Sequence, residues 1–180
     1  ASFDRVFGDG QIMVMDASFD TGATVDQVVA RVRFMAKALD CKVIVLDHIS
    51  ILVSGGQHGD ERKALDEIMT KLRTLTQDTG IVLFAVSHLK RPEGKGHEEG
   101  SATSISQLRG SASIAQLSDF VIGLERNGQA EDEIERCTTQ MRVLKNRFSG
   151  ITGPAGNLLY DTDTGRLSEY EPADYEEEAL

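Results

Sequence analysis

Two polar residues follow the two most apolar short runs of the sequence. Asp47 comes directly after residues 43–46, and His88 comes directly after residues 81–87. Runs this short and this rich in apolar, mostly β-branched residues predict strands buried on both faces, as in a parallel sheet. Ligands of open α/β sheets bind beyond the carboxyl ends of the strands. We therefore expect Asp47 and His88 to lie side by side at a ligand-binding edge.

Each of these side chains has a specific use at such an edge. The Asp47 carboxylate could hold the water shell of a Mg²⁺ ion, which usually takes only one or two protein carboxylates. The His88 imidazole could donate to a phosphate oxygen. The simpler alternatives are that Asp47 begins a turn and that His88 faces solvent at the end of a strand.

Basic residues follow His88 and also end a later strand. Lys90, Arg91 and Lys95 lie among glycines, which is typical of a flexible segment that contacts a phosphate backbone. Nearby glutamates oppose this charge, so a solvated loop is the alternative. Lys145 and Arg147 close the predicted strand 138–145. Arg147 either pairs with carboxylates of its own domain or reaches a neighbouring subunit's nucleotide.

The spacing of apolar residues predicts the elements that position these groups. Thr24 and Gln27 fit a capping box at the start of a helix. A second amphipathic helix is expected from about Asp60 to Gly80, and with the two apolar strands it forms a βαβ unit. The other predicted elements are strands at 11–15, 119–124 and 138–145, a helix at 105–117, an acidic link at 128–136, and a hairpin of 157–160 with 166–170.

Composition is that of one soluble globular domain. Of the 180 residues, 40% are hydrophobic and 27% are charged, and no run is long enough to span a membrane. The two cysteines, Cys41 and Cys137, are expected to be reduced structural thiols of a cytoplasmic protein. A net charge of −10 argues against nucleic-acid binding through the overall field, so any such contact must be local. We expect a domain at 1–170 and an acidic disordered tail at 171–180.

Four segments occur in an order that resembles one family: Val-Ile-Val-Leu-Asp47-His-Ile-Ser, Ser87-His-Leu-Lys-Arg-Pro92, Gln107-Leu-Arg-Gly-Ser-Ala-Ser-Ile-Ala-Gln116 and Leu144-Lys-Asn-Arg-Phe-Ser-Gly150. They resemble the later motifs of the DnaB-like ring helicases, most closely the helicase half of bacteriophage primase–helicases and its mitochondrial relative Twinkle. The resemblance implies an α/β fold with a RecA-like P-loop NTPase core. Such a core is a mostly parallel sheet flanked by helices, here with a C-terminal β-hairpin and truncated before the first motif.

The resemblance also implies roles for the matching positions. Asp47 matches the Walker B aspartate that orders Mg²⁺ and ATP (or dTTP), and His88 matches the γ-phosphate sensor. Arg147 matches the arginine finger, with Lys145 as its companion. The other matches are Gln116 and Arg109 in the motif that couples nucleotide state to the DNA loop, Arg126 and Tyr160 around the adenine, and Lys90, Arg91 and Lys95 facing single-stranded DNA. For Tyr160 the alternative is an ordinary hairpin aromatic.

The sequence departs from the family pattern at several places. No G-x-x-x-x-G-K-[ST] loop occurs, and the family's catalytic glutamate is also absent. The chain opens on Ala1 without a methionine, which suggests a processed or excised piece. Residues 128–136 are acidic where the family has a DNA loop, so we do not expect DNA contact there. The acidic tail resembles the extensions through which phage helicases recruit DNA polymerase; a solubilising end is the alternative.

These observations lead to one function hypothesis and two alternatives. The chain is interpreted as the C-terminal portion of an ATP-dependent replicative DNA helicase that forms homo-hexamers and translocates on single-stranded DNA. It would act in the cytoplasm, that of the host if it is phage-encoded, and the isolated fragment is expected to be inactive. The alternatives are a non-catalytic DNA-binding or oligomerisation module and a recombinase-like ATPase of the same fold.

Overall fold

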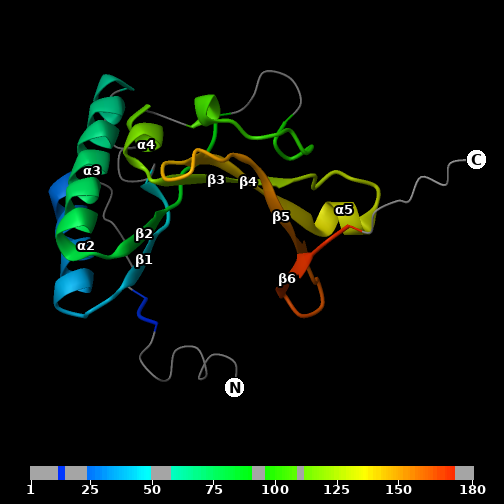
Figure 1. The fold of residues 1–180 in the computed structure, drawn as a ribbon, viewed down its shortest axis with the longest axis horizontal. Coiled ribbons are helices and arrows are strands. Elements are labelled where there is room, and N and C mark those ends of the chain that lie inside the picture. The colour runs from blue at the N-terminus through cyan, green and yellow to red at the C-terminus, as the bar shows by residue number, and fades with distance from the viewer. Residues whose placement is uncertain (1–11, 15–23, 50–57, 91–95, 109–111, 173–180) are drawn as a thin grey trace, which may run out of the picture.

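The computed structural model describes residues 12–14, 24–49, 58–90, 96–108 and 112–172, with the side chains of 58–61 left out. In this part of the chain the elements are α2 (Val25–Lys37), β1 (Val43–Leu46), α3 (His58–Thr79), β2 (Val82–Ala85), a 3₁₀ helix (Ile105–Gln107), α4 (Ala112–Leu117), β3 (Phe120–Arg126), α5 (Glu133–Cys137), β4 (Thr138–Asn146), β5 (Gly153–Tyr160) and β6 (Leu167–Tyr170). Figure 1 shows the helices α2, α3 and α4 gathered at one end of the molecule and the strands β3 to β6 extending away from them.

The predicted βαβ unit is confirmed. β1 and β2 pair in parallel, with Leu46 opposite Ala85, and α3 connects them. The capping box at the start of α2 is present, because the Thr24 hydroxyl accepts from the Gln27 N–H while the Gln27 side chain accepts from the Thr24 N–H. α3 begins two residues earlier than predicted, and Gly80 follows its end with a φ of +71°, which glycine adopts readily.

The predicted apolar stripes of α2 and α3 form the core of this layer. Ile68 and Leu75 of α3 are fully buried, and Val28 of α2 is 1% exposed. These side chains pack with Ile44 of β1 and Ile114 of α4 in one hydrophobic cluster. Burial of each such side chain stabilises the fold by roughly 1.5–3 kcal/mol.

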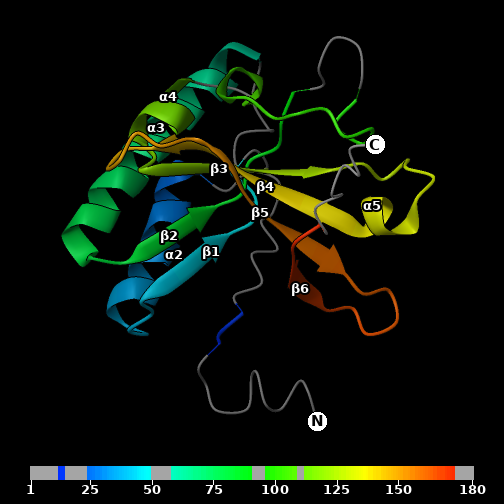
Figure 2. The same ribbon diagram turned by 45° about the vertical axis from the view of Figure 1, so that its right-hand side comes forward.

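The expectation that β1 and β2 are buried on both faces is wrong in the described structure. Ile44 is 2% exposed, but Val43 and Val45 are 58% and 64% exposed. Successive side chains of a strand point to opposite faces of the sheet. Helices α2 and α3 cover only the face that carries Ile44, and Figure 2 shows both helices on the same side of β1 and β2. The apolar sequence of these strands therefore predicts more burial than the described residues provide.

The remaining strands form a four-stranded antiparallel sheet in the order β3-β4-β5-β6. The strands predicted at 119–124 and 138–145 and the C-terminal hairpin are confirmed. β5 begins at Gly153, four residues before the predicted hairpin strand 157–160, and Gly153 and Gly156 have φ values of +132° and +120° inside the strand. The predicted acidic link contains α5, whose start is capped by the Asp132 carboxylate accepting from the Glu135 N–H.

Three further predictions differ from the structure or extend beyond it. The described part of the predicted strand 11–15, residues 12–14, has no regular secondary structure, and the predicted helix 105–117 is instead a 3₁₀ helix followed by α4. Most of the acidic tail lies outside the described residues. Cys41 and Cys137 are free thiols. Among the described helices, none combines the length and apolar character that a bilayer crossing needs.

Candidate functional site

Asp47 and His88 leave the parallel sheet at the same edge, as predicted. Pairing continues beyond the strands, because the Val86 N–H donates to the Leu46 carbonyl at 2.9 Å and the Ile49 N–H donates to the Val86 carbonyl at 2.9 Å. These bonds hold the segments that carry Asp47 and His88 together. Both side chains are exposed, so solvent and ligands can reach them.

A second imidazole joins this edge. The rings of His48 and His88 are stacked with their centroids 4.1 Å apart and their planes tilted by 32°. The Nδ1 atom of His48 is buried without a hydrogen-bond partner. Sequence analysis did not single out His48, although its position next to Asp47, at the end of a strand neighbouring that of His88, was the signal that could have found it.

The Asp47 carboxylate fits an ion that keeps its own water shell. Within the described ranges, no group of three or more His, Cys, Asp or Glu side chains gathers as a set of direct metal ligands. A single exposed carboxylate suits Mg²⁺, which dehydrates reluctantly and usually takes one or two carboxylates. Asp47 is therefore compatible with a hydrated Mg²⁺, and its role in holding one stays a prediction.

The segment that follows His88 is fixed at its base. Leu89 forms an antiparallel bridge with Leu108, and the Lys90 N–H donates to the Gln107 carbonyl at 2.7 Å. The Lys90 side chain is exposed. The other predicted DNA-contact residues, Arg91 and Lys95, lie outside the described residues, as does Arg109.

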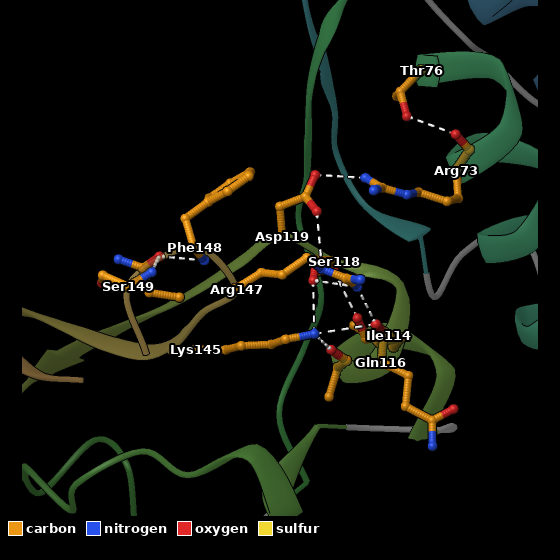
Figure 3. A network of polar contacts seen from close by, with 12 residues as sticks. Arg73, Thr76, Ile114, Gln116, Ser118, Asp119, Lys145, Arg147, Phe148 and Ser149 are labelled. Atoms are coloured by element: carbon orange, nitrogen blue, oxygen red, sulfur yellow. Dashed lines mark hydrogen bonds and ion pairs between the residues drawn. The ribbon is translucent and has the colours of Figure 1, made fainter. Parts of the chain in front are cut away.

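Lys145 and Arg147 meet the C-terminal end of α4 (Figure 3). The Lys145 ammonium donates to the carbonyls of Ala115, Gln116 and Ser118 at 2.5, 3.1 and 2.8 Å. Arg147 Nη2 donates to the same Gln116 carbonyl at 2.5 Å. Cations are favourable at a helix C-terminus, where the last carbonyls lack intrahelical partners. The two cations therefore hold the end of β4 against α4.

Asp119 ties Arg147 to α3. Its Oδ2 accepts from Arg73 Nη1 at 2.5 Å, and its Oδ1 lies 3.1 Å from Arg147 Nε without the alignment of a hydrogen bond. The pKa of Lys145 is lowered from its ordinary value, chiefly by burial. The nearby charges of Arg147 and Arg73 lower it further, and the charge of Asp119 opposes this shift. In this chain Arg147 thus pairs with a carboxylate of its own domain, which was the alternative expected from the sequence. Its side chain is still 41% exposed.

Gln116 contributes its backbone to this cluster. Its carbonyl accepts from both Lys145 and Arg147, whereas its side-chain amide points away from the two cations in Figure 3. The side chain is exposed. A role for that amide in sensing nucleotide state stays a prediction.

Arg126 and Tyr160 share one face of the antiparallel sheet. Arg126 is opposite Thr139, which is opposite Leu158, and Tyr160 lies two residues beyond Leu158. Directly paired residues and residues two apart point to the same face. Arg126 Nε donates to the Arg136 carbonyl at 2.7 Å, and Tyr160 is 36% exposed. Their predicted place around an adenine remains a prediction.

A buried carboxylate that sequence analysis missed lies farther along β3. Glu125 is 7% exposed and binds Arg142 of β4 through both carboxylate oxygens, at 2.7 and 3.1 Å. Its Oε1 also accepts from the Thr103 N–H at 2.7 Å and from the Thr103 hydroxyl at 2.8 Å. Burial raises the pKa of Glu125, but the hydrogen bonds from Arg142 and Thr103 together lower it below its ordinary 4.5.

The lowered pKa of Glu125 predicts acid sensitivity. Its network stabilises the fold fully above the unfolded-state pKa and loses that contribution as pH falls through the lower folded-state pKa. We expect Glu125→Gln to cost about 2 kcal/mol at neutral pH, because Arg142 loses a charged partner, and to make unfolding less pH-dependent below pH 4.5. Urea unfolding of both proteins across this range measures the effect. Parallel pH profiles would contradict it.

Comparison with known proteins identifies the chain. The profile of the family described as DnaB-like helicase C terminal domain matches residues 6–169. The chain belongs to this family. A DNA helicase/primase of Enterobacteria phage T3 is 46% identical over 174 residues, which are 96% of this chain and 29% of that protein. The replicative DNA helicase DnaC of Bacillus subtilis (strain 168) is 24% identical over 139 residues, 76% of this chain and 29% of that protein.

Two solved structures share the fold. A DnaB-like replicative helicase, studied with its interactions with primase, superimposes with a TM-score of 0.64 at 18% identity, covering 83% of this chain and 36% of that one. The KaiC-like protein PH0186 of Pyrococcus horikoshii OT3 gives a TM-score of 0.60 at 18% identity, covering 94% of this chain and 64% of that one. The α/β, RecA-like fold class predicted from the sequence is confirmed. The mostly parallel sheet expected with it is not seen among the described strands, because β1 and β2 pair in parallel whereas β3 to β6 pair antiparallel.

The DnaB-like assignment confirms the resemblance drawn from the four ordered segments, since all four lie within the matched residues. This DnaB-like domain spans less than a third of the two curated relatives named above. What those longer proteins do as a whole therefore enters the next subsection as a proposal.

Proposed function

We propose that this DnaB-like domain is the C-terminal part of the motor of an ATP-dependent replicative DNA helicase. In the full-length protein it would couple ATP hydrolysis at subunit interfaces to translocation on single-stranded DNA and to duplex unwinding. The observation that carries this proposal is the edge at which exposed Asp47 lies beside the stacked His48–His88 pair. There a carboxylate that would order Mg²⁺ and an imidazole that would sense phosphate leave neighbouring parallel strands.

The residues of this edge have separate tasks. Asp47 would hold the hydrated Mg²⁺ of a bound ATP or dTTP, and that Mg²⁺–nucleotide supplies the phosphoryl group whose transfer to water drives the cycle. His88 would donate a hydrogen bond to the terminal phosphate. Leu89 and Lys90 directly follow His88 and are bonded to Leu108 and Gln107, respectively. A shift of His88 would therefore move the base of the basic segment that would contact DNA.

Arg147 and Lys145 would serve the nucleotide of the next subunit in a homo-hexamer. A guanidinium placed across a subunit boundary stabilises the charge of the transferring phosphoryl group. Arg147 is part exposed and shares Asp119 with Arg73, so Asp119 keeps a cationic partner if Arg147 turns toward a neighbour. Polymerase recruitment by the acidic tail and a cytoplasmic location are also proposals, and no contact of the described residues bears on either.

The isolated 180-residue chain is proposed to be inactive, because it contains no G-x-x-x-x-G-K-[ST] loop to cradle phosphates. This sequence fact keeps the non-catalytic binding module as the second candidate for the chain alone. The motor function belongs to the full-length protein.

The proposed function predicts that single-stranded DNA stimulates ATP hydrolysis by the full-length protein and that the protein unwinds a forked duplex. Affinity for the DNA should fall linearly in log–log form as salt rises, since phosphate contacts release counterions. Lys90→Ala should weaken DNA binding for all sequences and reduce the magnitude of the salt slope by about 0.7, the value for one phosphate contact to a single strand. A steady-state ATPase assay with a DNA titration, repeated at several salt concentrations, measures the stimulation and the affinity for DNA. An ATPase that ignores DNA would contradict the motor and favour the binding module.

A further inference from the structure

The segment that follows the predicted DNA-contact residues is attached to β3. Glu99 forms an antiparallel bridge with Asn127, and Thr103 is bonded to Glu125 farther back along the same strand. Residues 99–103 therefore run antiparallel to β3. Gly100 adopts a φ of +82° and packs against the Asn127 side chain.

Thr103 is the central contact of this attachment. It is 6% exposed, and both its N–H and its hydroxyl donate to Glu125 Oε1. A Cβ added at Gly123 would meet the Thr103 hydroxyl at 2.0 Å, so Thr103 packs directly on the β3 backbone. Only glycine leaves room for this approach.

Glu125 extends the attachment from β3 to β4. Its carboxylate binds Arg142 through both oxygens, and Arg142 Nη2 also donates to the Gln140 side chain at 3.1 Å. Arg142 lies three and five residues before Lys145 and Arg147. One buried carboxylate thus connects the segment after the DNA-contact residues to the strand that ends in the two cations.

We propose that Glu125 is a positioning residue. By binding Thr103 and Arg142 together, it makes the C-terminal base of the DNA-contact segment and the strand of Lys145 and Arg147 move as one body. The N-terminal base of the same segment follows His88, so its position would depend on the nucleotide bound to the same subunit. The position of the C-terminal base would depend on the nucleotide bound to the neighbouring subunit. This inference rests on the proposed function and adds a second route between DNA and nucleotide.

The test compares Thr103→Val and Thr103→Ser in the full-length protein. Valine matches the shape of threonine but removes the hydroxyl that donates to Glu125, whereas serine keeps it. The readouts are the ATPase rate without DNA and the fold-stimulation by single-stranded DNA. We expect Thr103→Val to keep the DNA-free rate within about twofold and to lose about tenfold in stimulation, which is the effect of one hydrogen bond to a charged group. Thr103→Ser should restore stimulation.

Thr79→Val is the matched control, because the Thr79 hydroxyl donates within its own helix, to the Leu75 carbonyl at 2.7 Å. It should leave stimulation unchanged. Glu125→Gln tests the same connection from the other side and should also lower stimulation more than the DNA-free rate. A merely structural role would lower the unfolding temperature and leave the stimulation ratio unchanged.

The outcomes separate this inference from the function on which it rests. If DNA stimulates the unaltered protein and Thr103→Val is stimulated equally, the positioning role is wrong and the proposed function stands. If DNA does not stimulate even the unaltered protein, the proposed function is wrong and the inference falls with it.

Discussion

Replacing Arg147 with alanine in the full-length protein is expected to lower DNA-stimulated ATP hydrolysis by about 10³-fold or more, while the protein still assembles into rings. The reason is that a trans arginine neutralises charge that develops only in the transition state of phosphoryl transfer. The intrachain cost is small by comparison. Arg147 is 41% exposed, and Asp119 keeps its bond to Arg73. Steady-state ATPase assays and electron microscopy of the rings measure the two quantities.

Arg33→Ala is the matched control for this experiment. Arg33 is exposed on α2 and belongs to neither the β1–β2 edge nor β4, so its loss should change neither quantity. Normal turnover in intact rings of Arg147→Ala would contradict the finger role. Arg147 would then serve only to hold Asp119 and the end of α4 together.

The second large effect is expected at Asp47. Asp47→Asn keeps the shape of the side chain but removes the charge that would orient hydrated Mg²⁺, and several kcal/mol of transition-state stabilisation depend on that ion. We expect at least about a 10²-fold loss of ATP hydrolysis with nearly unchanged thermal stability, because Asp47 is exposed. Rates measured across a magnesium titration, together with thermal unfolding, test this expectation.

Asp40→Asn is the matched control for Asp47→Asn. Asp40 lies in the turn before β1, has a φ of 54° that asparagine tolerates, and pairs among the described residues with exposed Lys42 at 2.6 Å. Full activity of Asp47→Asn at ordinary magnesium concentrations would remove Asp47 from the metal site. Equal losses in both variants would point to a general charge effect.

The helices and most strands could be predicted from sequence because their signals are local. The capping box of α2 and the apolar stripe of α3 are each set by residues three or four positions apart. The two strands that lead to Asp47 and His88 were predictable because each is a short continuous apolar run. The error was in burial, since an apolar strand such as β1 shows only that it can be covered on both faces and not that it is.

The candidate site was predicted only in part. The sequence by itself determined that Asp47 and His88 end neighbouring parallel strands, because a βαβ connection leaves both carboxyl ends at one edge. The tertiary structure alone decided that His48 stacks on His88, that Arg147 pairs with Asp119, and that Glu125 joins Thr103 to Arg142. Residues 103 and 125 are 22 positions apart, and Arg73 and Asp119 are 46 apart. Contacts over such separations depend on sheet register and helix packing, which no local pattern of residues encodes.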